Sequence, residues 1–107
     1  MSEDIMKKIQ TQIDKNKILL YMKGTKEIPQ CGFSARVVQI LNSYGVSYET
    51  VDILVDPELR QALKEFSNWP TFPQLYVKGR LIGGCDICVE MAQNGELEPL
   101  VKSAAEG

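Results

Sequence analysis

The sequence predicts an α/β domain with a four-stranded mixed sheet flanked by helices. The first half of the chain alternates a short apolar strand, an amphipathic helix and a second strand, which is typical of a βαβ unit. The second half contains two strand-like segments around Lys78-Gly79, a pair of residues suited to a tight hairpin turn. The length of 107 residues suits one domain, so we expect a single domain over residues 1–107.

The first helix and the first strand are predicted from their apolar residues. Ile5, Ile9 and Ile13 lie four positions apart and therefore share one helical face. Ile18–Met22 is a short apolar run bounded by polar residues, as expected for a strand that is buried on both faces. A polar loop over residues 24–30 follows it.

A second helix is predicted to begin after Cys31 and to end at Gly45. Its apolar stripe is expected to consist of Phe33, Val37, Ile40, Leu41 and Tyr44. Residues 48–53 alternate in polarity and are rich in β-branched side chains, which favours a second strand.

The third helix is expected to begin at Asp56-Pro57, an N-cap residue followed by a proline in the first turn. The side chains that it should bury are Leu59, Ala62, Leu63 and Phe66. Residues 75–82 form the predicted hairpin, and the two glycines that follow end its second strand. Two helices, over about residues 86–93 and 97–101, complete the domain, and residues 103–107 are expected to be a frayed end.

Composition excludes several classes of protein. The net charge is -2 and no basic patch is present, which excludes nucleic acid as a partner. The acidic N-terminus lacks the apolar stretch of a signal peptide, and Ile18–Met22 is too short to span a bilayer, so we expect no membrane association.

The cysteines are Cys31, Cys85 and Cys88, and the chain has no histidine. An odd number of cysteines without a signal peptide argues against a disulfide framework and favours a reducing compartment, so we expect a cytoplasmic protein. The lack of histidine excludes a Cys–His dyad and any histidine-containing metal site.

Cys31 is the leading candidate for chemistry. It lies between a predicted strand and the start of a helix, where backbone N–H groups stabilise an anion. Its thiol should therefore have a lowered pKa, and Lys23 would add positive charge. Ser34 occupies the position of the second thiol in a Cys-x-x-Cys motif, so Cys31 needs an external thiol or a metal. The alternative is an inert buried cysteine.

Two further segments have features of a binding site. A proline at the start of a strand, as in residues 71–73 (Thr-Phe-Pro), can adopt a cis bond, which would leave the backbone of Phe72 free to pair with an extended peptide. The glycines of residues 83–86 (Gly-Gly-Cys-Asp) would let a ligand approach the backbone. Asp86 is expected to cap the following helix or to pair with an amine. Taken alone, each segment favours an ordinary loop or turn.

Cys85 and Cys88 form a Cys-x-x-Cys motif that would suit a redox dithiol or half of a zinc site. Cys88 shares a helical face with Met91 and Ala92, however, which favours a position in the core.

Lys23 and Arg60 are cations far apart in the sequence. If the fold brings them near Cys31, they would suit a terminal carboxylate, and otherwise they are solvated surface residues.

Together these features resemble those of the monothiol glutaredoxins. The resemblance covers about residues 5–101 and implies a thioredoxin-like fold that binds glutathione. It rests on four motifs in order: Lys23-Gly24-Thr25, Cys31-Gly32-Phe33-Ser34, Trp69-Pro70-Thr71-Phe72-Pro73 and Gly83-Gly84-Cys85-Asp86.

The glutathione-binding residues that the resemblance implies are Lys23, Arg60, Thr71, Phe72, Pro73, Gly84, Cys85 and Asp86. The two cations would hold the glycine carboxylate, the backbone before a cis proline would pair with the cysteinyl residue, and the last two residues would hold the γ-glutamyl end. Residues 25–30 match an insertion that in this family is associated with shifting glutathione away from good redox geometry.

The resemblance also implies a 2Fe–2S cluster, which takes four thiolates. One chain offers one suitable thiolate, Cys31, so two chains and two glutathione molecules would complete the set in a cluster-bridged homodimer. A cluster with non-protein ligands should transfer easily. The family's partners are BolA-like proteins and iron–sulfur acceptor apoproteins.

Two alternatives stay open. A glutathione-dependent thiol–disulfide oxidoreductase, at most weakly active, would use Cys31 as its sole nucleophile to remove glutathione from mixed disulfides. An interaction module would instead bind zinc at Cys85 and Cys88. The sequence also leaves open the role of Cys88 and whether Cys31 can form a disulfide with Cys85.

Overall fold

The computed structural model describes residues 3–107, so Met1 and Ser2 of the expected domain lie outside the described residues. The elements in chain order are α1 (Glu3–Lys15), β1 (Ile18–Met22), α2 (Gly32–Ser43), β2 (Glu49–Asp52), α3 (Pro57–Ser67), β3 (Gln74–Val77), β4 (Arg80–Gly83), α4 (Cys85–Gln93) and α5 (Leu97–Glu106).

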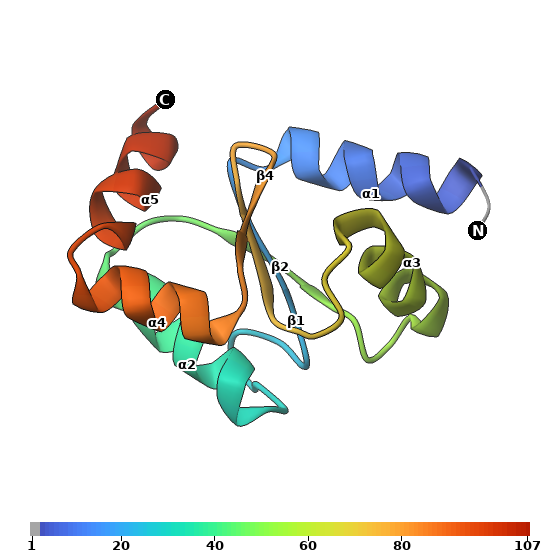
Figure 1. Ribbon diagram of the computed structural model, residues 1–107, viewed down its shortest axis with the longest axis horizontal. Helices are drawn as coiled ribbons and strands as arrows, with labels where there is room; N and C mark the ends of the chain where they lie inside the picture. The colour runs from blue at the N-terminus through green and yellow to red at the C-terminus, as the bar shows by residue number, and fades with distance from the viewer. Residues whose placement is uncertain (1–2) are drawn as a thin grey trace.

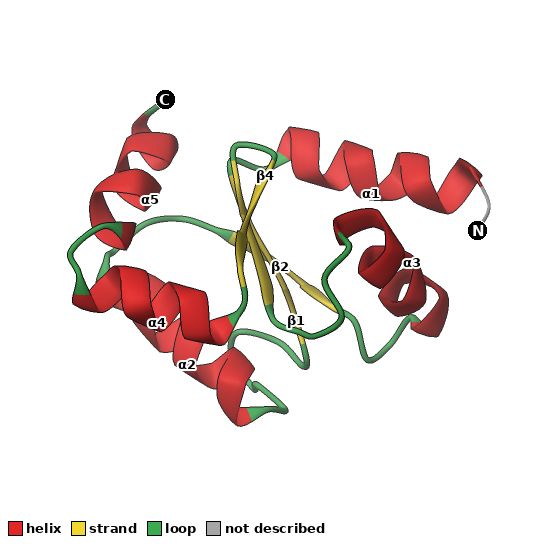
Figure 2. Ribbon diagram, viewed as in Figure 1, coloured by secondary structure: helices red, strands yellow, loops and turns green. Residues whose placement is uncertain are grey.

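The strands form one mixed sheet in the order β2-β1-β3-β4, which confirms the predicted fold class. β1 pairs with β2 in parallel, and β3 pairs with both β1 and β4 in antiparallel orientation. Helices cover both faces of the sheet, with α1 and α3 on one face and α2, α4 and α5 on the other (Figures 1 and 2).

The central strand β1 explains why the chain contains one continuous apolar run. Ile18, Leu20 and Met22 belong to the core cluster beneath α2, α4 and α5, whereas Leu19 and Tyr21 belong to the cluster beneath α1 and α3. A strand that is covered on both faces is apolar at every position, so β1 lacks the alternation of apolar and polar residues that a half-exposed strand shows.

The predicted start of α3 and the predicted hairpin turn are confirmed at the level of single residues. Asp56 caps α3, and its Oδ1 accepts a hydrogen bond of 3.1 Å from the backbone N–H of Leu59. The hairpin turns at Lys78 and Gly79, whose φ angles of 50° and 79° both lie in the left-handed region that such a turn requires. The Phe72–Pro73 bond is cis, as the sequence suggested.

The expectations about the start of α2 and the end of α5 are wrong. Phe33 does not belong to the buried stripe of α2; its side chain is 63 % exposed, because the first turn of α2 extends past the end of the sheet. Residues 103–107 are not a frayed end, since α5 continues to Glu106. The longer helix buries Val101 and Ala104 in the core, and this apolar contact holds the last turns in place.

The topology brings the functional segments to one end of the sheet. Because β3 runs antiparallel to both β1 and β4, its first residue lies beside the last residues of those two strands. The loop after β1, the cis-proline segment before β3 and the start of α4 after β4 therefore meet. None of the described helices combines the length and apolar character that crossing a membrane requires.

Candidate functional site

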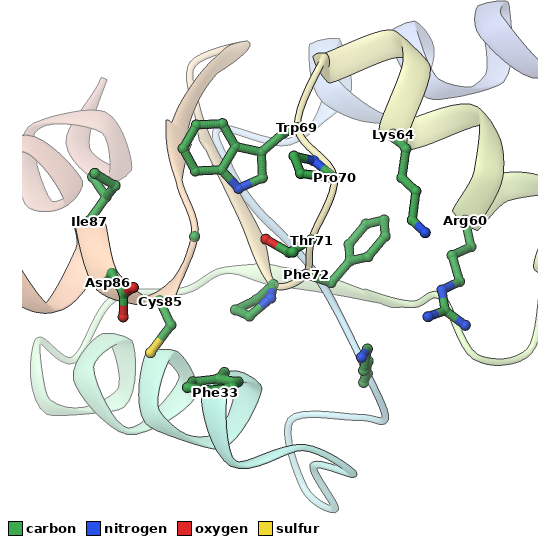
Figure 3. A pocket seen from close by; sticks show the side chains of 13 residues that line it. Phe33, Arg60, Lys64, Trp69, Pro70, Thr71, Phe72, Cys85, Asp86 and Ile87 are labelled. Atoms are coloured by element: carbon green, nitrogen blue, oxygen red, sulfur yellow. The ribbon is translucent and has the colours of Figure 1, made fainter.

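A cavity of about 430 Å³ lies where these segments meet, between α3, the segment before β3 and the start of α4 (Figure 3). The structure places there every residue that the sequence suggested for glutathione: Lys23, Arg60, Thr71, Phe72, Pro73, Gly84, Cys85 and Asp86. Cys31 is not among the lining residues, but it interacts electrostatically with both Lys23 and Cys85, so it adjoins the cavity.

Other residues line the cavity that the sequence analysis did not assign to ligand binding. They are Phe33, Lys64, Trp69, Pro70 and Ile87. Lys64 could have been found from its spacing, because it follows Arg60 by one helical turn and side chains four residues apart share a face. Phe33 was missed as a lining residue because it was predicted to belong to the buried stripe of the helix.

The loop after β1 fixes the position of Cys31. The backbone N–H of Gln30 donates to the carbonyl of Lys23 at 2.9 Å, and that of Thr25 donates to the carbonyl of Ile28 at 3.2 Å. Gly24 has a φ of 91°, and its N–H donates to Oδ1 of Asp52 at 2.9 Å, which ties the loop to the end of β2. The chain therefore enters α2 along a path closed by hydrogen bonds.

Cys31 is the N-cap residue of α2, and its thiol has a lowered pKa. The largest cause is the backbone N–H of Ser34, which favours the thiolate. Partial burial opposes the shift, while the N–H of Phe33, the charge of Lys23 and the hydroxyl of Ser34 add to it. These are the groups that a helix N-terminus offers to an anion, so the expected activation of this cysteine is confirmed in direction.

Ser34 has a structural role at the position where a dithiol motif carries its second cysteine. Its side chain is fully buried, and its Oγ accepts a hydrogen bond of 3.1 Å from the backbone N–H of Lys23. The hydroxyl thus joins the first turn of α2 to the end of β1.

The other two cysteines differ from Cys31. Cys85 is partly buried, and burial, together with the nearby charge of Asp86, raises the pKa of its thiol. Cys88 is completely buried in the core beneath α2 and α4, and burial raises the pKa of its thiol to about 12. Neither thiol is activated, and the buried position of Cys88 does not favour a zinc site there.

Charge is distributed unevenly along the cavity. Arg60 and Lys64 extend from α3 at one end, and Asp86 lies at the opposite end beside the N-terminus of α4 (Figure 3). Among the described residues, the Nε of Arg60 is a buried nitrogen without a hydrogen-bond partner. A ligand with a carboxylate at one end and an amino group at the other would match this arrangement.

The start of α4 differs from the expectation for Asp86. The N-cap residue is Gly84, and Asp86 lies within the first turn, because the helix begins one residue earlier, at Cys85. A Cβ on Gly84 would lie 3.2 Å from the carbonyl oxygen of Pro73 and 3.4 Å from Nε1 of Trp69. Glycine therefore lets the helix N-terminus approach the cis-proline segment closely.

Phe72 offers unpaired backbone groups beside the cavity. Within residues 3–107, neither its N–H nor its carbonyl forms a hydrogen bond. An extended peptide in the cavity could pair with both groups, as an added strand does.

The comparisons with known proteins agree with this geometry. The glutaredoxin family model matches residues 18–82, which include Cys31, the cis proline and most of the sheet. The chain belongs to the glutaredoxin family. Within that family it is a monothiol glutaredoxin: it is 57% identical over 102 residues to a protein of Rickettsia typhi named probable monothiol glutaredoxin 2, covering 95% of this chain and 92% of that one.

Two other relatives support the assignment. Glutaredoxin 4 of Escherichia coli is 55% identical over 100 residues, covering 94% of this chain and 87% of that protein. The solution structure of reduced apo GrxS14 from poplar superposes with a TM-score of 0.83 at 50% identity, covering 96% of this chain and 94% of that one. The thioredoxin-like fold that the sequence suggested is thus confirmed.

In this monothiol glutaredoxin, the lowered pKa of Cys31 predicts a distinctive pH profile of alkylation. In a Cys85→Ser/Cys88→Ala background, the rate of reaction with iodoacetamide should rise with pH, with a midpoint below that of a free cysteine, because only the thiolate reacts. Replacing Lys23 by Gln should move this midpoint upward, since the replacement removes a charge that favours the thiolate.

Lys64→Gln is the matched control for Lys23→Gln, because Lys64 also lines the cavity but does not contribute to the pKa shift of Cys31. A midpoint equal to that of free cysteine in the parent protein would contradict the proposed activation.

Proposed function

We propose that this monothiol glutaredoxin binds glutathione in the cavity and carries a 2Fe–2S cluster as cargo, shared between two copies of the chain. The observation that carries the proposal is an activated thiol, Cys31, beside a cavity that is cationic at one end and acidic at the other. Glutathione itself has a glycine carboxylate at one end and an amino acid group at the other.

Glutathione would lie across the cavity in an extended conformation. Its glycine carboxylate would contact Lys23 and Arg60. The buried Nε of Arg60 has no hydrogen-bond partner among the described residues and could donate to this carboxylate. Its cysteinyl residue would pair with the unpaired backbone groups of Phe72, next to Thr71 and the cis Pro73.

The γ-glutamyl end would lie at the start of α4. The amide groups of this helix N-terminus, which follows Gly84 and includes Cys85, would bind the α-carboxylate, and the carboxylate of Asp86 would pair with the amine. This position would bring the glutathione thiol to the same side of the molecule as Cys31.

Two chains would be needed to hold the cargo. A 2Fe–2S cluster takes four thiolates, and each chain would contribute Cys31 and one bound glutathione. Because half of the ligands are small molecules, the cluster would pass readily to acceptor apoproteins by ligand exchange, and BolA-like proteins are the further partners that we propose. The exposed side chains of Ile28 and Phe33 flank Cys31 in the sequence and would face such a partner.

The chain would act as one domain, since both core clusters pack against the same sheet. The proposed site of action is the cytoplasm, because the chemistry requires Cys31 and glutathione to remain reduced.

Anaerobic reconstitution with ferrous iron, sulfide and glutathione tests the proposal. We expect a coloured dimer, and removal of glutathione by gel filtration should release colourless chains. A coloured dimer that persists without glutathione would contradict the proposed ligand set.

A second function is favoured by the same lowered pKa. The Cys31 thiolate would attack the glutathione sulfur of a mixed disulfide, and the target protein would leave as a thiolate. A second glutathione thiolate would then attack the Cys31 adduct, releasing glutathione disulfide and regenerating Cys31. Turnover in a reductase-coupled assay comparable to that of a dithiol glutaredoxin would favour this enzyme over the carrier.

A further inference from the structure

Gln74, the first residue of β3, uses all the hydrogen-bonding capacity of its side-chain N–H groups on the cis-proline segment. The side chain is completely buried. Its Nε2 donates to the carbonyl of Trp69 at 3.1 Å and to the carbonyl of Thr71 at 3.3 Å, and its Oε1 accepts from the hydroxyl of Tyr76 at 3.2 Å. An amide has two N–H donors, and both are committed here.

The segment that Gln74 contacts has few other constraints. In the described part of the chain, residues 70–73 form no backbone–backbone hydrogen bond outside the helices and strands, and two of these residues are prolines without an N–H. Hydrogen bonds hold the start of the segment, where the N–H of Trp69 donates to the carbonyl of Lys64 and to Oγ of Ser67, and this hydroxyl also donates to the carbonyl of Trp69 at 3.4 Å. At its end β3 pairs with β1, and the side chain of Phe72 packs in the core. Between these anchors, the carbonyl of Thr71 accepts a hydrogen bond from the side chain of Gln74, which therefore fixes the orientation of the peptide unit between Thr71 and Phe72.

One of these peptide units contains the group that would recognise the ligand. The carbonyl of Thr71 and the N–H of Phe72 belong to the same trans peptide, since the following Phe72–Pro73 bond is the cis bond of this segment. In a planar trans peptide these two groups point in opposite directions. When Gln74 holds the carbonyl toward the protein interior, the N–H of Phe72 must point away from the interior.

We propose that Gln74 is a positioning residue for glutathione: by holding the carbonyls of Trp69 and Thr71, it aims the backbone N–H of Phe72 at the cysteinyl residue of the ligand. The inference rests on the proposed glutathione site and goes beyond it, because Gln74 does not line the cavity and acts through the backbone of its neighbours.

The test compares Gln74→Met, which keeps the length of the side chain but removes its polar groups, with Tyr76→Phe. The second change removes the hydroxyl that contacts Gln74 and leaves both bonds from Gln74 to the segment intact. Glutathione affinity is measured by calorimetry well below the unfolding temperature, and stability is measured by urea unfolding. We expect Gln74→Met to weaken glutathione binding about tenfold, and Tyr76→Phe to lower stability with little change in affinity.

A purely structural role would lower the stability of Gln74→Met and leave the affinity of its folded form at the value of the parent protein, and this result would overturn the inference. Failure of the parent protein itself to bind glutathione would instead refute the proposed function, so the two failures can be told apart.

A measurement on the unmodified protein covers the case in which Gln74→Met does not fold. Saturation with glutathione should shift the NMR signals of the Gln74 side-chain amide, because a new bond to the N–H of Phe72 polarises the carbonyl of Thr71 in the same peptide. The side-chain amide of Gln10, which donates to Asp14 on the exposed face of α1, is the control and should not shift. Unchanged Gln74 signals on saturation would overturn the inference.

Discussion

Replacing Cys31 by serine is expected to abolish cluster binding completely. Serine keeps the shape of the side chain and the N-cap position but has no thiolate to ligate iron, and each half of the dimer would lose its protein ligand. After anaerobic reconstitution with glutathione, the variant should show no visible absorbance and should elute as a single chain in gel filtration.

Two matched variants test whether the loss of cluster binding is specific to Cys31 or follows from the removal of any cysteine. Cys85→Ser keeps the backbone that lines the cavity, and Cys88→Ala removes a buried thiol from the core. Both should retain the colour, although Cys88→Ala should unfold at a lower temperature because it leaves a small cavity. Colour that survives Cys31→Ser and disappears with Cys85→Ser would show that the wrong thiol had been assigned to the metal.

Replacing Gly24 by alanine is expected to have the second-largest effect. The residue has a φ of 91°, and a Cβ there would lie 2.6 Å from both the backbone N of Gln30 and the carbonyl oxygen of Ile28. Neither backbone atom can move without opening the loop that leads into Cys31. We expect a loss of about 2–5 kcal/mol in the free energy of unfolding, measured in urea, together with weaker cluster retention.

Gly45→Ala is the matched control, because Gly45 also has a positive φ, of 68°, but a Cβ there meets nothing within 4 Å. It should therefore show only the backbone cost, about 1 kcal/mol. If the two variants lose the same stability, steric contact within the loop contributes nothing and the loop is not closed as described.

The sequence predicted those parts of the fold that depend on strong local signals. Ile18–Met22 was predicted to the residue because a strand covered on both faces has no polar position. The start of α3 was predicted because Asp56 and Pro57 each have a local reason to begin a helix. The hairpin followed from the glycine in Lys78-Gly79, because glycine tolerates the left-handed backbone of the turn.

The sequence-based predictions were wrong where burial or a helix boundary depends on tertiary contacts. Phe33 has the spacing of a buried residue, yet the turn that carries it projects past the sheet, and no periodicity reveals where a sheet ends. The last turns of α5 have weak sequence signals and exist because Ala104 fits into the core. Asp86 was assigned to the N-cap because aspartate favours that position, but Gly84 is the N-cap residue and the helix begins at Cys85.

Part of the candidate site could be named in advance, but not its arrangement. Motif order pointed to Cys31 and to those lining residues that the resemblance assigns to glutathione, but not to Lys64 or Ile87. The proximity of Lys23 to Arg60 depends on which strands are neighbours. The contribution of Gln74 left no trace in the sequence pattern, because a buried glutamine at the start of a strand has no local signature.

The buried hydroxyl of Ser34 has a consequence for converting this protein into a dithiol enzyme. The oxygen at this position accepts a hydrogen bond from the backbone N–H of Lys23. A sulfur atom in its place would be bulkier and a poorer acceptor, so installing a resolving thiol would also loosen the join that holds the reactive residue in register with the sheet. In this chain, therefore, the serine that replaces a second thiol is also the residue that holds the turn carrying Cys31 against the sheet.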